Sequence, residues 1–72
     1  MIVEARDPAT GESHYFNVNF AAKSGKPYQF MWRDGRRAVL EVHVVPHAPP
    51  DAEVHAAAFD VPSHEIIVQA GR

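Results

Sequence analysis

Cysteine is absent from this chain of 72 residues. Without a thiol, the protein can form no disulfide and offers no thiolate as a metal ligand or nucleophile. The sequence also has no apolar run close to the ~20 residues that a membrane-spanning helix needs. The first residues, Met1 to Arg6, have no basic region ahead of an apolar stretch and do not resemble a signal peptide. From these absences we expect a soluble, cytoplasmic protein without membrane contact.

Length and charge limit the domain organisation. We predict one small domain over residues 1–72, because a chain of this size buries only about 60% of its unfolded surface and supports one marginal core. Residues 1–37 contain six basic and four acidic groups, for a charge of +2, whereas residues 38–72 contain one basic and five acidic groups, for −4. The protein is therefore mildly acidic, and its acidic half could attract basic partners.

Alternating apolar side chains predict strands between residues 14 and 45. Alternate side chains of a strand point to opposite faces, so a period of two marks one buried face. Two segments show this period, and a third, 38–45, is rich in valine. With a short candidate strand over 2–6, these segments predict a four-stranded antiparallel meander from residues 2–45. The apolar positions of the first two segments are Phe16, Val18 and Phe20, then Tyr28, Phe30 and Trp32.

The turns between these strands set the expected register. Asp34-Gly35 is a strong hairpin signal, and we expect a three-residue loop over 33–35 with a left-handed glycine. A two-residue loop would turn the large apolar groups of 38–45 to the other face. The expected strand pairs are Phe30 with Ala38 and Tyr28 with Leu40 across this turn, and Phe20 with Tyr28 and Phe16 with Trp32 across the preceding connection.

Residues 51–61 fit either a helix or a strand. A helix would begin at Asp51 or Pro50 and end before Pro62, and three consecutive alanines favour it, although Phe59 lies off its apolar stripe. As a strand, the segment would line one face with His55, Ala57, Phe59 and Val61. We expect the helix, then a strand over 64–69, and therefore an α+β fold with one short helix packed on a small antiparallel sheet. The alternative is an all-β fold, a small barrel or sandwich.

Five histidines raise the hypothesis of a metal site. Glu41 and His43 share the outer face of the third strand and could supply two ligands. A third would come from His14, His55 or His64. Zinc sites need three or four ligands in preset geometry, and no paired motif provides them. A histidine-based metal site is therefore a secondary alternative, and we predict no metal ligand and no cofactor.

Catalytic motifs are also missing from the sequence. Ser13-His14 and Ser63-His64 are adjacent pairs, but neighbouring side chains of a strand point to opposite faces, so adjacency makes no dyad. No serine has the glycine spacing of a nucleophile elbow. The carboxylates are scattered along the chain, which does not suit acid–base catalysis in a cleft. We therefore predict that the protein is not an enzyme.

Aromatic side chains beside arginines suggest an alternative function in binding nucleic acid. Bases stack on aromatic rings and phosphates meet cations in several small-sheet binders. Tyr28, Phe30 and Trp32 lie near Arg33 and Arg37 and could act in this way. The same rings are the large groups available for a core, and the net charge of −2 opposes phosphate binding. Nucleic acid is therefore the less favoured partner.

The outer face of the expected sheet is the preferred binding surface. It combines apolar and neutral polar side chains with few charges, as the centres of protein interfaces do. In the expected register Asn17 lies opposite Met31, close to Tyr15 and Val39. Acidic side chains of the second half would steer the protein to a basic surface. The predicted partner-binding residues are Tyr15, Asn17, Met31, Val39, Asp51, Glu53 and Asp60.

These patterns together favour a binding role over a catalytic one. We predict a non-enzymatic protein-binding module that acts as an inhibitor or adaptor of a larger protein assembly. Small acidic single domains often act in this way on larger machines, such as those encoded by phages or mobile elements, and this step is an analogy. A marginal core also favours a homodimer, because association buries further apolar surface.

Overall fold

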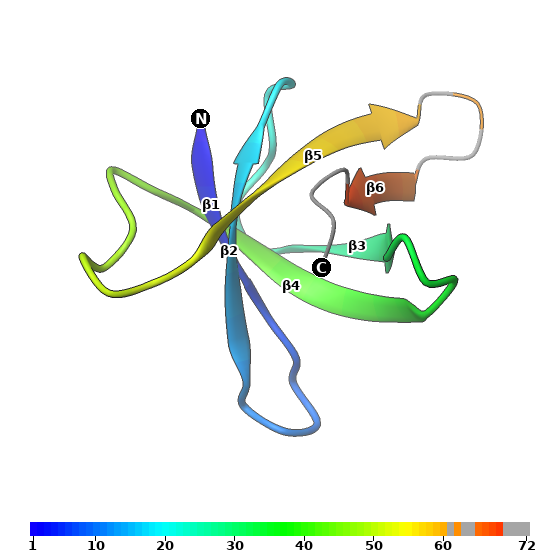
Figure 1. Ribbon diagram of the computed structural model, residues 1–72, viewed down its shortest axis with the longest axis horizontal. Helices are drawn as coiled ribbons and strands as arrows, with labels where there is room; N and C mark the ends of the chain where they lie inside the picture. Colours follow the sequence, from blue (N-terminus) through cyan, green and yellow to red (C-terminus); the bar gives the residue numbers. More distant parts are fainter. Residues whose placement is uncertain (61, 63–64, 69–72) are drawn as a thin grey trace.

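The protein is a closed β-barrel in a computed structural model that describes residues 1–60, 62 and 65–68, with the exception of the Asp60 side chain. The strand order around the barrel is β1–β2–β5–β6–β3–β4, with β4 pairing back onto β1 (Figure 1). The strands are β1 (Ile2–Arg6), β2 (Ser13–Val18), β3 (Lys26–Met31), β4 (Arg37–Val45), β5 (Val54–Asp60) and β6 (Glu65–Val68). The described chain contains no helix, so the α+β prediction is wrong and the all-β alternative, a small barrel, is confirmed.

The segment expected to be a helix is strand β5. It pairs with β2 in parallel and with β6 in antiparallel orientation. Its inward positions hold His55, Ala57 and Phe59, whose rings and methyl group contact the interior. The three alanines favour a helix, but helix propensity is a weak effect that tertiary packing overrides. Phe59 packs against the interior because the segment is a strand. Val61, the fourth residue of the expected strand face, lies outside the described residues.

The expected four-stranded meander is also wrong, because β2 and β3 are not neighbours. The β5–β6 hairpin lies between them on one side of the barrel, and β1 and β4 lie between them on the other. The predicted neighbours Phe16 and Trp32 therefore meet across the interior, with ring centroids 6.5 Å apart, and Phe20 and Tyr28 meet at 6.4 Å. The period of two placed these rings on the correct face, but closure of the barrel changed which strands pair.

The hairpin between β3 and β4 has the predicted register. Phe30 pairs with Ala38 and Tyr28 with Leu40. The backbone N–H of Trp32 donates to the carbonyl of Arg36 at 2.8 Å and closes the three-residue loop. Gly35 has a φ of 91°, the left-handed conformation that the loop requires. The predicted strand over 64–69 is also confirmed in its described part, β6, whereas residues 64 and 69 lie outside that part.

Alternate residues of all six strands fill the barrel. The central layer is aromatic, since the rings of Phe16 and Phe30 are 5.0 Å apart and both side chains are fully buried. Each strand sends its inward residues to this core and its polar residues to the surface, as expected for a small barrel. The buried apolar residues are Val3, Ala5, Phe16, Val18, Phe30, Leu40, Val42, Ala57, Ile66 and Val68.

The two ends of the barrel differ in how the chain connects its strands. At one end, the segment 19–25 joins β2 to β3, which lie in opposite walls, and it must therefore cross the barrel. We call this the sealed end. At the other end, the turns 7–12 and 32–36 each join neighbouring strands, and we call this the open end. Both turns lie there because β1 and β4 are antiparallel neighbours, with Arg6 opposite Glu41.

Side chains of the crossing segment and of two strands fill the sealed end. The ring of Phe20 lies 5.0 Å from that of Phe59 and 6.4 Å from that of Tyr28. The crossing segment is also held to β4, because the amide of Gly25 donates to the carbonyl of Val42 at 2.8 Å. This end of the core is thus covered by the chain itself. Across the described residues there is no helix with the length and apolar character needed to cross a bilayer.

Candidate functional site

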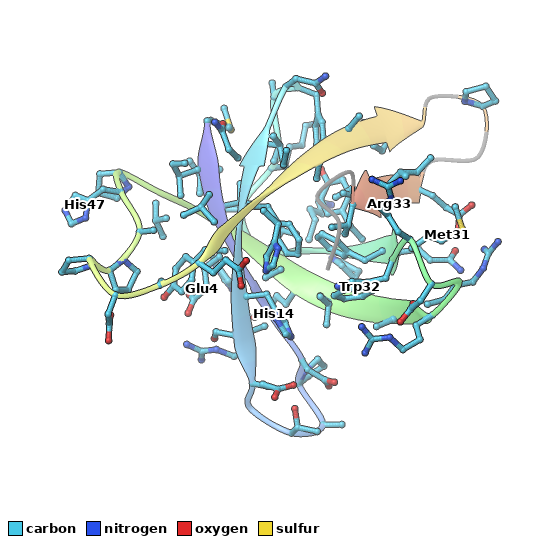
Figure 2. All side chains as sticks on the ribbon, in the orientation of Figure 1. Glu4, His14, Met31, Trp32, Arg33 and His47 are labelled. Carbon is cyan, nitrogen blue, oxygen red and sulfur yellow. The ribbon has the colours of Figure 1, made fainter. Side chains whose placement is uncertain are left out.

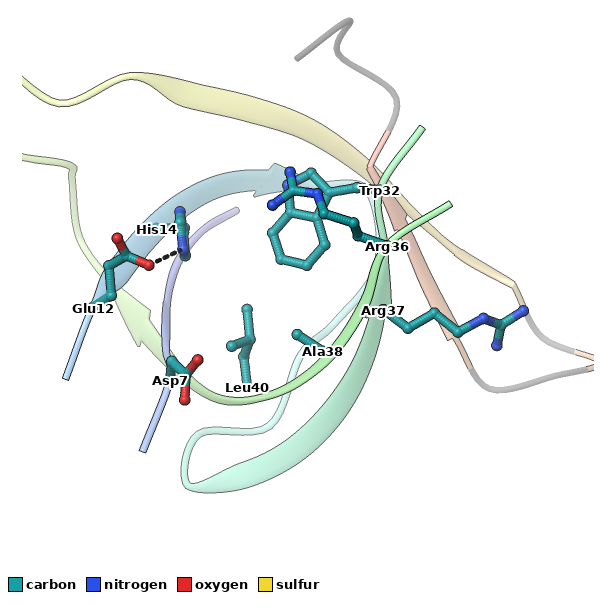
Figure 3. Close-up of a pocket in the computed structure, with 8 residues that line it drawn as sticks. All are labelled: Asp7, Glu12, His14, Trp32, Arg36, Arg37, Ala38 and Leu40. Atoms are coloured by element: carbon teal, nitrogen blue, oxygen red, sulfur yellow. Dashed lines mark ion pairs between the residues drawn. The ribbon is translucent and has the colours of Figure 1, made fainter. Parts of the chain in front are cut away.

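A hollow of about 280 Å³ lies at the open end of the barrel. Side chains from the turn 7–12, from strand β2 and from the β3–β4 hairpin surround it (Figure 3). Its lining residues are Asp7, Glu12, His14, Trp32, Arg36, Arg37, Ala38 and Leu40. We call this hollow the mouth pocket.

Trp32 forms the aromatic wall of the mouth pocket. It follows β3 directly, and its backbone pairing with Arg36 fixes where the side chain begins. The indole ring continues the aromatic core, with its centroid 6.1 Å from that of Phe30 and 6.5 Å from that of Phe16. Trp32 therefore joins the buried rings to the solvent-accessible hollow.

A guanidinium group already packs against this tryptophan. The Cζ atom of Arg36 lies 5.4 Å from the centroid of the Trp32 ring, within the range of a cation–π contact. The Nε of Arg36 also donates to Oδ2 of Asp34 at 2.8 Å, and its backbone N–H donates to Oδ1 at 3.0 Å. That backbone hydrogen bond is the main reason why the pKa of Asp34 lies below its ordinary value of 3.8. The turn thus neutralises its own arginine.

His14 forms the wall opposite the hairpin. It is an inward residue of β2, and its ring lies edge-on to that of Trp32 at 5.8 Å. Its Nε2 lies 3.6 Å from Oε1 of Glu12 (Figure 3). This contact is an ion pair only when the imidazole is protonated. Beside a neutral histidine, the negative charge of Glu12 is not compensated by His14.

Asp7 places a carboxylate at the rim of the mouth pocket. Its Oδ1 accepts a hydrogen bond from the amide of Ala9 at 2.9 Å, which forms an Asx turn. Its backbone N–H donates to the carbonyl of Glu12 at 2.8 Å, and its carbonyl accepts from Gly11 at 2.8 Å. The turn therefore holds the carboxylate in place without a cationic partner from the described residues.

Charge and polarity divide the mouth pocket into distinct parts. Leu40 and Ala38 are inward residues of β4 and give it an apolar floor. The guanidinium of Arg37 points away from the hollow and pairs with the largely buried carboxylate of Glu65 (Figure 3). The lining thus combines an apolar floor, one indole with the Arg36 guanidinium packed on it, one imidazole and two carboxylates, a mixture suited to an amphipathic ligand.

The predicted contact residues on β2 lie in a different wall from those on β3 and β4. Tyr15 is half-buried, and its hydroxyl donates to Oε2 of Glu4 at 3.4 Å. Desolvation and the negative charge of Glu4 raise the pKa of Tyr15 above its ordinary value of 10.0. Asn17 is exposed, and its strand partners are Ile2 and Ala56. The expected pairing of Asn17 with Met31 is therefore wrong.

Met31 and Val39 share one wall of the barrel. Met31 is half-buried at the end of β3, opposite Arg37 and Ile67. Val39 is 59% exposed, and its partner across the strand is Gln29, as predicted. These two predicted contact residues are close together, whereas Tyr15 lies three strands from Met31 and two strands from Val39 around the barrel. Their role in binding a partner remains a prediction.

The predicted acidic residues lie on the β4–β5 connection and on β5. Asp51 and Glu53 are exposed within the segment 46–53, which extends from the barrel on the side of His47, away from Met31 (Figures 1 and 2). The side chain of Asp60 lies outside the described residues. The structure thus brings neither Asp51 nor Glu53 to the wall that holds Met31.

Histidines do not converge on a metal site within the described chain. No group of three or more His, Asp or Glu side chains there has an arrangement that could hold a metal ion. The proposed ligands Glu41 and His43 lie on the outer face of β4 and contact each other, with 2.8 Å between Oε1 and Nε2. His55 points inward instead, and its ring lies 5.4 Å from that of Phe16. His64 lies outside the described residues.

The aromatic residues considered for nucleic-acid binding face the interior. Phe30 is fully buried, and Tyr28 and Trp32 are half-buried against the core. Bases need exposed ring faces for stacking. The rings of Phe30 and Tyr28 therefore provide no external stacking platform, whereas the ring of Trp32 lines the mouth pocket.

The mouth pocket was not predicted from the sequence. The sequence suggested His14 as a metal ligand or as part of a Ser13-His14 pair, and Trp32 as a core or stacking residue, while Asp7 and Glu12 were assigned no functional role. Both turns were predictable from their glycines, Gly11 and Gly35. Their meeting at one end depends on the pairing of β1 with β4, which the local pattern does not reveal.

The fold and the pocket define a small closed β-barrel with one amphipathic hollow at its open end. No protein-family model, curated protein or solved structure matches this chain. The function must therefore be inferred from the geometry of the barrel.

Proposed function

We propose that the protein is a non-enzymatic protein-binding module, an inhibitor or adaptor of a larger assembly, and that it binds its partner at the open end. The observation that carries this proposal is the mouth pocket. Fully buried side chains fill the middle of the barrel, whereas the open end keeps a hollow of about 280 Å³ with a tryptophan wall. Tryptophan in a partly desolvated pocket is a frequent centre of protein interfaces.

Chemistry of the lining supports binding rather than catalysis. The lining residues include no serine, threonine, cysteine or lysine, and their ionisable groups other than the arginines are Asp7, Glu12 and His14. Both arginines are neutralised by carboxylates, Arg36 by Asp34 and Arg37 by Glu65. The hollow is also slightly smaller than the roughly 300–1,000 Å³ typical of small-molecule sites. It fits one side chain of a protein partner.

A peptide library tests the location of the binding surface. Peptides selected from a random library on the immobilised protein should perturb the amide NMR signals of the turns 7–12 and 32–36. Filling the pocket in the variant Ala38→Leu should weaken their binding by about tenfold or more, a loss of ~1.4 kcal/mol. The matched variant Val39→Leu places the same side chain on the outer face of the same strand and should bind normally.

The proposal fails if the selected peptides perturb only the outer walls or bind Ala38→Leu and wild type equally. It also fails if no peptide binds at either surface. Thermal unfolding of both leucine variants serves as the folding control, because only a folded Ala38→Leu variant reports on the pocket.

The outer wall around Val39 is a second candidate surface. Val39 has an exposed fraction of 59%, the highest among the exposed large apolar residues of the described chain, and its strand partner Gln29 is uncharged. A homodimer would cover this wall and add apolar burial to a small core. Light scattering at high concentration should then give a dimer mass for wild type and a monomer mass for Met31→Lys and Val39→Lys. The control Asn19→Lys, exposed near the sealed end, should remain dimeric. A monomeric wild type would remove this candidate.

A further inference from the structure

We infer that the mouth pocket receives one cationic side chain, a lysine or arginine of the partner protein. This inference rests on the proposed function, since it names the chemistry by which the open end recognises its partner. It depends on three features of the pocket: its uncompensated negative charge, its aromatic wall and its apolar floor.

Charge in the mouth pocket is unbalanced toward the negative. The two arginines in the lining have carboxylate partners outside it, Asp34 and Glu65. Asp7 and Glu12 meet no lysine or arginine among the residues that the structure describes, and Glu12 has only His14 nearby. Asp7 is half-buried and Glu12 is exposed. Each carboxylate gains more from an incoming cation than from a neutral group, and the gain is larger at the less solvated Asp7.

The aromatic wall is suited to the same ligand. Arg36 shows within this protein that Trp32 accepts a guanidinium over its ring, at 5.4 Å from the centroid. Figure 3 shows the indole, His14, Leu40 and Asp7 arranged around a common space. A cation in that space would lie beside the indole and near the Asp7 carboxylate, which combines cation–π and ionic attraction.

The apolar floor explains why a side chain rather than an inorganic ion would bind. Lysine and arginine have a methylene stem that buries on apolar surface while the charged group contacts polar atoms. Ala38 and Leu40 provide such a surface below the carboxylates. Three histidine or carboxylate ligands for a metal ion, by contrast, are not grouped in the described chain.

The intrinsic fluorescence of Trp32 gives a direct test, because this is the single tryptophan of the chain. Titration with N-acetyl-arginine N-methylamide and with its lysine counterpart should change the emission saturably. The citrulline counterpart has nearly the shape of arginine without its charge and should bind about tenfold more weakly or not at all. Raising the salt concentration should weaken the binding of the two cationic probes, because salt screens their attraction to the carboxylates.

Charge-only variants connect the signal to the pocket. Asp7→Asn keeps an oxygen that can accept from Ala9, and Glu12→Gln keeps the side-chain length, so each removes charge with little change in shape. Each substitution should lower the affinity for the arginine probe by about three- to tenfold. Glu41→Gln removes a carboxylate from the outer face of β4 and should leave the affinity unchanged.

Three outcomes would overturn the inference: no saturable emission change, equal binding of arginine and citrulline probes, or equal losses in Asp7→Asn and Glu41→Gln. The peptide selection separates this inference from the proposed function. Peptides that contain no lysine or arginine and still bind at the open end would support the proposed function and contradict the inference of a cationic ligand. Binding of the arginine probe without any open-end peptide would do the reverse.

Discussion

The two ends of this barrel are formed by the same strands, but the chain covers the core at the sealed end and leaves a hollow at the open end. At the sealed end, Phe20, Tyr28 and Phe59 form a cluster of rings 5.0 to 6.4 Å apart. The crossing segment is fixed to β4, since the Val44 amide donates to Oγ of Ser24 at 2.8 Å. At the open end, the backbone–backbone hydrogen bonds that close the two turns stay within each turn.

The cause of this difference is the connectivity of the strands. β2 and β3 are far apart around the barrel, so the segment between them crosses the sealed end and carries Phe20 and Ala22 over the core. The turns 7–12 and 32–36 join adjacent strands and have no distance to cross. A closed barrel has no free strand edge to recruit a partner. This absence of a free edge is consistent with the proposed binding at the open end.

The largest expected effect is a difference in how much a substitution at each end lowers the free energy of unfolding. Phe20→Ala should lower the free energy of unfolding by about 2 kcal/mol, because it removes two of the three ring contacts in the cluster at the sealed end. His14→Ala removes a half-buried ring at the open end and should cost no more than about 0.5 kcal/mol. Urea unfolding followed by circular dichroism measures both values.

Equal losses in the two variants would remove the distinction between the ends. A loss for His14→Ala above that for Phe20→Ala would show that the open end stabilises the barrel. The role of the pocket would then be structural, and the proposed binding function would lose its main support.

A smaller effect is expected from the turn that carries the pocket tryptophan. Gly35 has a φ of 91°, and a Cβ added there would meet no atom within 4 Å. The cost of Gly35→Ala is therefore backbone strain alone, about 1–2 kcal/mol. Asparagine adopts the left-handed region more readily, so Gly35→Asn should cost less than the alanine variant. Thermal and urea unfolding of both variants provide the comparison.

This pair of substitutions also tests whether the open-end turns are locally autonomous. If Gly35→Ala changes the NMR signals of the turn 32–36 but not those of the turn 7–12, the two turns act separately, as their hydrogen bonds indicate. Signals that change across both turns would reveal coupling through the pocket, and the contrast with the tied sealed end would weaken.

Local pattern was sufficient to predict which side chains face inward. The period of two assigned Phe16, Phe30 and Trp32 to one face, and all three contact one another in the barrel. Asp34-Gly35 also predicted the register of β3 with β4 correctly. Both predictions depend on interactions between residues close in sequence, where turn chemistry and side-chain alternation decide the structure.

Long-range pairing was not predictable in the same way. The β5–β6 hairpin inserts between β2 and β3, and nothing in the local pattern of β2 selects β5 as its parallel partner. For 51–61, the alanines indicated a helix, whereas the position of Phe59 off the helical stripe indicated the strand. The packing of Phe59 against Phe20 and Tyr28 decided the outcome.

The same limit applies to the candidate site. Met31 and Val39 were predicted to be neighbours and are, because one hairpin holds both. Tyr15 was expected on their face, but closure moved it to another wall. Asp7 and Trp32 line one pocket although 25 positions separate them in the sequence. A site formed by two turns becomes visible only when the strands that bring them together are known.

The smallest expected effect concerns acid stability and again involves the open-end turn. The backbone N–H of Arg36 lowers the pKa of Asp34 below 3.8, so the folded state favours the charged carboxylate. A depressed pKa contributes stability above the unfolded value, and that contribution is lost as the pH falls through the folded pKa. Wild type should therefore exceed Asp34→Asn in stability at pH 5, and the difference should shrink below about pH 3.8 and vanish at lower pH. Thermal unfolding of both proteins between pH 5 and about pH 2 measures it. A difference that stays constant with pH would mean that asparagine fails for reasons of shape, and that the charge on Asp34 does not hold Arg36 at the rim of the pocket.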